Sequence, residues 1–204
     1  LCQFLEKRQL KSLFLTKNES TAGTVAYRAS KEAIKEFLNK GAGFADYTSS
    51  SKAFGYTSDK WRHVVIRANK SLNLSSASFE NIRKSIKLAI ENYINATKRN
   101  GVGQKLWNFS WGNHGIDDAS ELVGTWLHEI GHQIHYATGN RLKPNGFPSI
   151  TKYSETSLGQ ATDSEWHAEH WAAWFADRQS LSDFDERIAH YFDELMKEAI
   201  HGGN

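Results

Sequence analysis

The chain has 204 residues, of which 25 are Lys or Arg and 23 are Asp or Glu, so its formal net charge at pH 7 is only +2. Aromatic residues make up 12% of the chain and include seven tryptophans, a composition that excludes a disordered protein. The balanced charge gives no reason to expect nucleic acid or an acidic membrane as a partner. A chain of this length can bury a core, so we expect a single domain over residues 1–204.

The sequence contains no signal that assigns a compartment. No apolar run approaches the roughly 20 residues that span a bilayer, and the first twenty residues lack the apolar core and cleavage site of a signal peptide. The only cysteine is Cys2, so we expect no internal disulfide. Because the chain does not begin with Met, we expect a processed chain or a fragment of a longer protein.

The N-terminal part mixes predicted helices and strands. Basic and apolar residues at helical spacing over 1–15 predict an amphipathic helical leader within residues 1–20. Ser30 and the segment after it predict a capped helix that ends at Gly41. Residues 42–60 are rich in Gly, Ser and Thr and predict a loop, whereas HVVIRA at 63–68 predicts a strand.

The rest of the chain is mainly helical by pattern. A long helix is predicted at about 78–99, and KLWNFSW at 105–111 predicts a strand. That strand is either interior or an edge along which an extended peptide substrate pairs. Three further helices are predicted at 118–138, 163–179 and 184–200, with caps at Asp118, Thr162 and Asp183. Strands and helices followed by helices alone favour an α+β fold.

The segment HEIGH places His128 and His132 four residues apart, with Glu129 directly after the first histidine. Residues four apart share one helix face, with about 5–6 Å between their Cβ atoms. Two imidazoles in this arrangement can bind one Zn²⁺. The ion lowers the pKa of its water to about 7, and the glutamate can take the proton as the water attacks a carbonyl. The pattern therefore predicts a metal site with its own base.

A catalytic zinc usually has three protein ligands, so a third must come from elsewhere. The metzincin pattern requires a histidine where this chain has Thr138, which excludes that arrangement. In the segment TDSEWHAEHWAAWFADR, Glu165 and Glu169 lie four apart and so share a helix face. One of them can bind the metal while the other accepts the free N–H of a ligating imidazole. The spacing alone leaves open which carboxylate binds.

These two motifs, with Tyr153 between them, resemble the gluzincin metallopeptidases, and within them the lethal-factor-like branch of toxin and phage-associated enzymes. The resemblance covers about residues 118–178. It implies a zincin-like domain with a small mixed sheet, a long helix and a helical C-terminal part that carries the metal site.

The same resemblance implies the hydrolysis of peptide bonds in a protein or peptide substrate. One Zn²⁺ would be held by His128, His132 and Glu165. Glu129 would act as the base, Glu169 would support a ligand, and Tyr153 would steady the oxyanion. A secreted or injected effector and a phage particle are the settings that the resemblance suggests.

Other histidines near the motifs have simpler interpretations. His135 lies on the side of the helix that carries His128 and is either a cleft residue or a structural one. His170 follows Glu169 and is either a donor to the oxyanion or part of the core. His167 is expected at the surface.

Two alternative functions remain open at the level of sequence. Arg28 and the run Ser49, Ser50 and Ser51 resemble features of ADP-ribosyltransferases, which transfer a group from NAD without a metal. The chain lacks a recognisable strand with the glutamate that this family requires. The other alternative is an inactive zincin-like domain that binds a partner.

Overall fold

The computed structural model describes residues 1–16, 55–57, 63–68, 78–101, 103, 105, 118–155 and 163–202. Contacts divide the chain into two compact units, residues 1–74 and 75–204. The single domain expected over 1–204 stays a prediction. The helix predicted at 30–41, nearly all of the strand predicted at 105–111, and Arg28 with Ser49–Ser51 lie outside the described residues.

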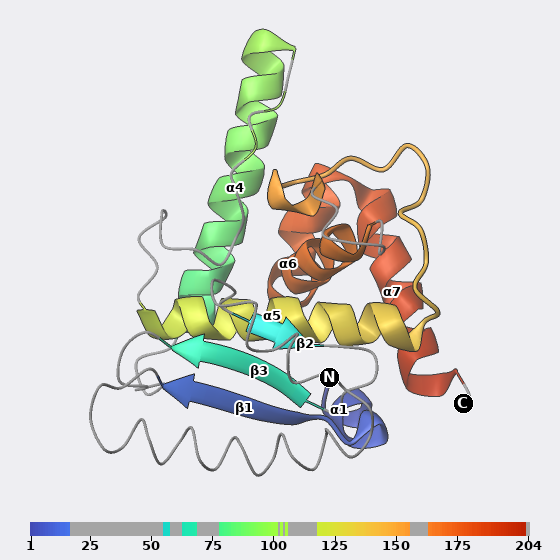
Figure 1. Ribbon diagram of the computed structural model, residues 1–204. Helices are drawn as coiled ribbons and strands as arrows, with labels where there is room; N and C mark the ends of the chain where they lie inside the picture. The colour runs from blue at the N-terminus through green and yellow to red at the C-terminus, as the bar shows by residue number, and fades with distance from the viewer. Residues whose placement is uncertain are drawn as a thin grey trace. The chain divides into compact units, whose positions relative to one another are not determined.

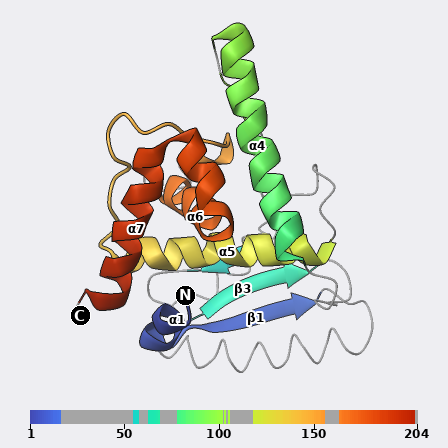
Figure 2. The ribbon, with the colours of Figure 1, turned by 180° about the vertical axis from the view of Figure 1, so that it is seen from behind.

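The first unit contains a short helix and a mixed sheet. Helix α1 (Cys2–Arg8) is followed by strands β1 (Lys11–Thr16), β2 (Gly55–Thr57) and β3 (His63–Ala68). The strand order is β1-β3-β2, with β1 parallel and β2 antiparallel to β3; Figures 1 and 2 show β1 beside β3. Val64 and Ile66 of β3 are fully buried, and side chains two residues apart on a strand point to the same face of the sheet.

Two predictions for this unit need correction and one is confirmed. The amphipathic leader is helical only to Arg8, because Gln9 adopts a left-handed conformation (φ 52°) that ends α1, and the next residues form β1. The loop predicted at 42–60 contains strand β2, whose pairing with β3 overrides its Gly-rich composition. The strand predicted at 63–68 is confirmed as β3.

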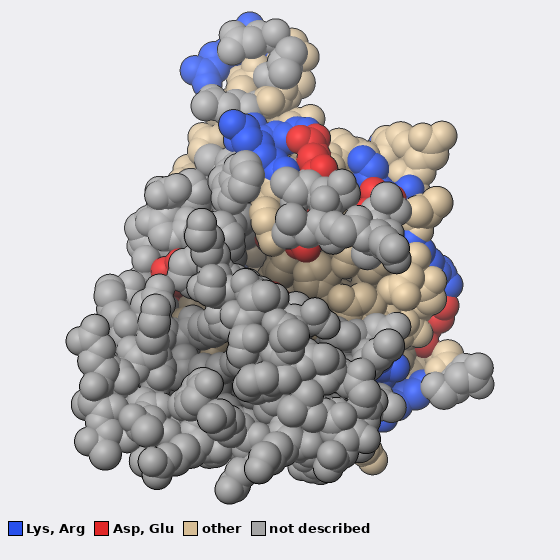
Figure 3. All heavy atoms as spheres, in the orientation of Figure 1, with Lys and Arg blue, Asp and Glu red and all other residues tan. Residues whose placement is uncertain are grey.

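The second unit begins with the long helix α4 (Phe79–Asn100), as predicted. The Ser78 side chain accepts a hydrogen bond from the Asn81 N–H at its start, and Gly101 ends it with a φ of 72°. The apolar face is buried at Ile82, Ile86, Ala89 and Ile90. In Figure 1 the C-terminal end of α4 extends beyond the other helices of this unit. Figure 3 shows basic side chains at that end, where Lys98 and Arg99 lie in the last turn.

The remaining helices are α5 (Asp118–Ala137), the short 3-10 helix η2 (Tyr153–Glu155), α6 (Ser164–Phe184) and α7 (Glu186–His201). Helix α6 contacts α4, α5, α7 and η2, and both ribbon views show it between α4 and α7. Its first ten residues, 164–173, are all buried. Helix α6 is therefore the core of this unit, and polar side chains on its first half are shielded from water.

Helices α5 and α6 approach each other closely where Gly131 faces Ala168. A Cβ atom added to Gly131 would lie 2.7 Å from the Cα and 2.8 Å from the carbonyl oxygen of Ala168. A side chain at this position would force the helices to shift, so glycine allows α5 and α6 to pack this closely.

Helix α6 is interrupted near its end. Asp177 has non-helical backbone angles (φ −152°, ψ 76°), and its carboxylate accepts hydrogen bonds from the backbone N–H and the hydroxyl of Ser180. The carbonyl of Ala176, which loses its helical partner at this point, accepts a hydrogen bond from the Arg83 side chain (3.1 Å). Asp177 thus caps a second, short helical segment within α6.

The predicted helix boundaries in this part hold with small corrections. Helix α6 starts after Asp163 rather than after a cap at Thr162, and it continues past 179 to Phe184. Asp185, not Asp183, caps α7 by accepting from the Arg187 N–H. None of the helices in the described part has an apolar stretch long enough to cross a membrane.

Candidate metal site

Helix α5 presents His128 and His132 one turn apart on one face. The surrounding positions Leu127, Ile130 and Ile134 are fully buried and fix the helix against its neighbours. Both histidines are buried as well, and their ring centroids lie 4.8 Å apart with nearly perpendicular planes. The sequence spacing therefore places two imidazoles together in a shielded environment.

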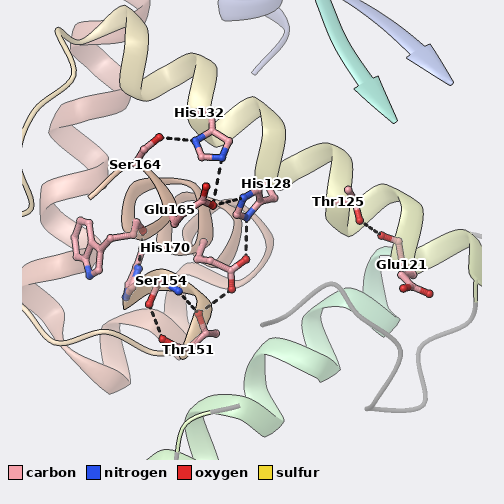
Figure 4. A network of polar contacts seen from close by, with 11 residues as sticks. Glu121, Thr125, His128, His132, Thr151, Ser154, Ser164, Glu165 and His170 are labelled. Carbon is pink, nitrogen blue, oxygen red and sulfur yellow. Dashed lines mark hydrogen bonds and ion pairs between the residues drawn. The ribbon is translucent and has the colours of Figure 1, made fainter. Parts of the chain in front are cut away.

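Helix α6 brings the Glu165 carboxylate to both histidines (Figure 4). Its Oε2 lies 3.0 Å from His128 Nε2 and 3.5 Å from His132 Nε2. The ligand atoms of the three residues all lie within 4.8 Å of one another, and the three residues could hold a metal ion. Of the two glutamates that the sequence left open, Glu165 is the one that faces both Nε2 atoms.

This donor set fits a small divalent ion. Ligands at about 2.0–2.1 Å in a tetrahedral site are separated from each other by about 3.3 Å, which lies between the two nitrogen–oxygen distances in the structure. Two imidazoles and one carboxylate also form a ligand set that leaves one position open. The residues present therefore suit the ion that the sequence pattern predicts.

The other nitrogen of each imidazole has its own partner. The Nδ1–H of His128 donates to Glu169 Oε1 (2.8 Å), and His132 Nδ1 forms a hydrogen bond with the Ser164 hydroxyl (2.8 Å), which can donate or accept. His128 Nε2 forms a hydrogen bond with Glu165 Oε2 (3.0 Å), and with a proton kept on Nδ1 this nitrogen could bind an ion through its lone pair. Both rings are therefore fixed in orientation, and the Glu169 carboxylate also fixes the proton on His128 Nδ1.

The electrostatics of the group also favour a cation. The carboxylates of Glu129, Glu165 and Glu169 are buried together, and within the described ranges no Lys or Arg side chain is paired with any of them. Buried negative charge is costly unless it is compensated. A divalent ion would supply that compensation.

The pKa shifts agree with this interpretation. Burial would lower the pKa of His128, but its hydrogen bonds with Glu165 and Glu169 and their charges raise that pKa well above its ordinary value. Burial would raise the pKa of Glu165, but the charges of and hydrogen bonds with His132 and His128 outweigh it and lower that pKa. A cation bound between these groups would replace the proton that both carboxylates stabilise on His128.

Glu129 is the one carboxylate of the group without a fixed partner. It is buried, and burial raises its pKa although His132 and His128 lower it. In the described part of the chain, its carboxylate has no hydrogen bond or ion pair, in contrast to Glu165 and Glu169. It is therefore available to a water molecule or a substrate.

Tyr153, in η2, lies next to the group formed by His128, His132 and Glu165. Its ring centroid is 5.6 Å from that of His128. Burial raises the pKa of its hydroxyl, and the nearby charges of Glu165, Glu129 and Glu169 raise it further. The phenol therefore keeps its proton near neutral pH and can act as a hydrogen-bond donor.

The other histidines are held in the protein interior. The Nε2–H of His135 donates to the Arg141 carbonyl (2.8 Å), and its ring stacks on His167 with 4.1 Å between centroids. His167 is fully buried, so the expectation that it lies at the surface was wrong; its Nε2 accepts from the Tyr191 hydroxyl (2.9 Å).

His170 is also fully buried. It donates from Nδ1 to the Trp166 carbonyl, and its Nε2 accepts from the Ile150 N–H. Both ring nitrogens are thus engaged with the backbone, and no N–H is left for an oxyanion.

Sequence reasoning missed two hydroxyls that belong to the site. Ser164, the residue before Glu165, bonds His132, and Thr151 donates to Glu169 Oε2 (2.9 Å). The sequence offered a signal for Ser164, because it precedes Glu165. If Glu165 reaches the HEIGH segment, its neighbour in the same helical turn also lies close to that segment. No sequence signal identifies Thr151.

Comparisons with known proteins leave this geometry as the basis for interpretation. No family model matches the chain, and no curated protein or solved structure matches it significantly.

Proposed function

We propose that the chain is a zinc-dependent peptidase with a zincin-like fold, in which His128, His132 and Glu165 hold one Zn²⁺ and Glu129 is the general base. The observation that carries the proposal is the pairing of a preorganised three-residue group with the buried Glu129 carboxylate, which has no hydrogen bond or ion pair to the described residues. A purely structural metal site would have no use for such a carboxylate.

The metal contributes one element of the chemistry. A bound Zn²⁺ acts as a Lewis acid that polarises a carbonyl and makes water more acidic. The chain's own residues supply the rest. Glu129 takes a proton from water as the water oxygen bonds to the carbonyl carbon, and it delivers that proton to the amine nitrogen as the C–N bond breaks. Water is thereby added across one peptide bond.

Tyr153 would stabilise the charge that develops on the carbonyl oxygen. Its protonated hydroxyl is the neutral donor that this step needs, and its position beside His128 puts it within the same buried region. Glu169 and Ser164 would hold the two imidazoles in place throughout the reaction.

The proposal is tested by separating metal binding from hydrolysis. The protein is loaded with Zn²⁺ and incubated with unfolded casein and with a proteome-derived peptide mixture, and new termini are detected by mass spectrometry. We expect cleavage that a chelator abolishes and that added Zn²⁺ restores.

Glu129→Gln should remove cleavage while the metal content stays at one ion per chain. Glu121→Gln, an amide substitution earlier in the same helix, serves as the control and should retain activity. Cleavage by Glu129→Gln at the normal rate would exclude this mechanism. Zinc binding without cleavage of any peptide would favour the alternative, an inactive zincin-like binding domain.

The ADP-ribosyltransferase alternative stays a prediction, since Arg28 and Ser49–Ser51 lie outside the described residues. The same chelator experiment separates the two enzymes, because transfer from NAD does not need the ion.

A further inference from the structure

The support of the metal site extends one residue beyond Glu169. Glu169 is almost completely buried, and each of its carboxylate oxygens has a separate partner. Oε1 accepts from the His128 Nδ1–H (2.8 Å), and Oε2 accepts from the Thr151 hydroxyl (2.9 Å). Thr151 is itself fully buried and lies 18 residues before Glu169 in the sequence. The loop between α5 and α6 thus contributes a direct contact to the outer part of the site.

The local turn fixes the direction in which the Thr151 hydroxyl points. A hydroxyl has one hydrogen to donate and two lone pairs. The Ser154 N–H donates to Thr151 Oγ1 (3.1 Å) and so occupies one of these lone pairs. The Ser154 hydroxyl donates to the Thr151 carbonyl (2.7 Å), which closes the turn at η2. The one hydroxyl hydrogen of Thr151 is left for the carboxylate.

A continuous chain of hydrogen bonds therefore runs from the loop backbone to a metal-ligating imidazole. The Ser154 N–H donates to Thr151, Thr151 donates to Glu169, and the two oxygens of Glu169 are held between Thr151 and His128. If the Thr151 hydroxyl were removed, Oε2 would be a buried acceptor without a partner. The carboxylate would then be free to rotate, and His128 would lose the partner that orients it.

We propose that Thr151 is a positioning residue of the metal site, which sets the affinity for the ion by holding Glu169 against His128. The inference rests on the proposed metal site. It adds that the loop leading to η2 supports the metal site through Thr151, which is not one of the three candidate ligands.

The test is the zinc affinity of the full chain, measured by competition with a chromophoric chelator. Thr151→Val keeps the shape of the side chain and removes the hydroxyl. We expect zinc to bind about tenfold more weakly, at the low end of the 10–100-fold range for groups that support metal ligands. Thr151→Ser restores the hydroxyl and should bind within about twofold of the wild type. The absorption spectrum of the Co²⁺-substituted protein should change in Thr151→Val and not in Thr151→Ser.

Two controls distinguish positioning from a general effect on the fold. Ser154→Ala breaks the hydrogen bond that closes the same turn but leaves the carboxylate contact in place, so zinc affinity should not change. In a Glu169→Ala background, Thr151→Val should have no further effect, because the group through which it acts is gone. If Thr151→Val does not fold, Thr151→Ala removes the hydroxyl without placing a methyl group against the carboxylate.

Several outcomes would overturn the inference. These are unchanged zinc affinity in both Thr151→Val and Thr151→Ala, an equal loss in Ser154→Ala, and an undiminished loss in the Glu169→Ala background. Failure of the wild-type chain to bind zinc would instead overturn the proposed function. The two failures are therefore distinguishable.

Discussion

His128 and His132 occupy equivalent positions on α5 but are supported by different chemistry. Each directs Nε2 at the same oxygen of Glu165, and both are buried to the same extent. Behind His128 lies the carboxylate of Glu169, which is itself held by Thr151. Behind His132 lies the neutral hydroxyl of Ser164. A hydrogen bond to a charged acceptor is roughly twice as strong as a neutral one, so we expect the His128 ring to be held more strongly than the His132 ring.

The largest effect is expected from Glu165→Ala, which removes the group shared by both histidines. Zinc affinity should fall by more than the roughly 100-fold that marks the upper end for supporting residues. The measurement is chelator competition, with Glu186→Ala on the exposed surface of α7 as the control. Unchanged zinc affinity would mean that the ion binds without the Glu165 carboxylate, and that this group is not the ligand that His128 and His132 share.

Gly131 lies between His128 and His132 in α5, so Gly131→Ala should disturb the two histidines equally. The new methyl group meets the backbone of Ala168, which cannot move aside without shifting α6. We expect the free energy of unfolding to fall by about 1–3 kcal/mol and zinc affinity to fall with it. Urea unfolding with and without zinc measures both quantities. An unchanged unfolding midpoint would show that α6 can withdraw without cost.

The difference between the two histidines is tested directly by Glu169→Gln and Ser164→Ala. Glu169→Gln should weaken zinc binding by about 10–100-fold, because the amide replaces a charged acceptor and also presents a donor to either His128 or Thr151. Ser164→Ala removes a neutral partner and should cost less, at most about tenfold. Equal losses in the two variants, measured in the same chelator assay, would contradict the proposed asymmetry.

A smaller effect is expected from His170, which makes the stability of the protein depend on pH. Burial lowers the pKa of His170 to about 3; the Trp166 carbonyl opposes this shift, while His167, Lys143 and Lys105 add to it. Protonation would also break the hydrogen bond that Nε2 accepts from the Ile150 N–H. The folded protein therefore keeps His170 neutral, whereas the unfolded chain binds a proton near pH 6.5.

The sign of the effect follows from this difference. Between about pH 6.5 and pH 3 the unfolded state binds more protons, so stability is fully present above pH 6.5 and falls as the pH is lowered. One such group contributes a slope of at most about 1.4 kcal/mol per pH unit. His170→Gln should flatten this part of the stability curve in urea unfolding experiments from pH 7 to pH 4. A curve with the wild-type slope would show that His170 is not the group responsible.

The parts of the site that depend on local spacing could be predicted from the sequence. HEIGH places two histidines on one face of a helix, and Glu165 and Glu169 lie on one face of a second helix. Both placements follow from helical periodicity. The helix that became α4 and the strand that became β3 were predicted for the same reason. Spacing alone does not say which helix turn meets α5, so the choice of Glu165 over Glu169 rested on the family resemblance; in the structure Glu165 Oε2 faces both Nε2 atoms.

What the sequence did not predict depends on contacts between distant segments. Thr151 reaches Glu169 from a loop whose path has no periodicity. The burial of His167 follows from the packing of α7, through Tyr191, on α6. The strand after Gln9 was masked by its helix-like spacing, since pairing with β3 rather than local pattern decides its conformation. In each case a tertiary contact overrides or completes a local signal.

The non-helical backbone at Asp177 divides α6 into two helical segments. The piece before it carries Ser164, Glu165 and Glu169, and the Ala176 carbonyl at its end is tied to α4 by Arg83. The piece after it starts from a new cap, where the Ser180 N–H donates to the Asp177 carboxylate instead of to a helical carbonyl. A change confined to the short segment between Asp177 and Asp185 is expected to be absorbed at the break, whereas α7 still packs on the first half of α6 through Tyr191 and His167. The candidate ligand Glu165 would then keep its register even if that short segment changed.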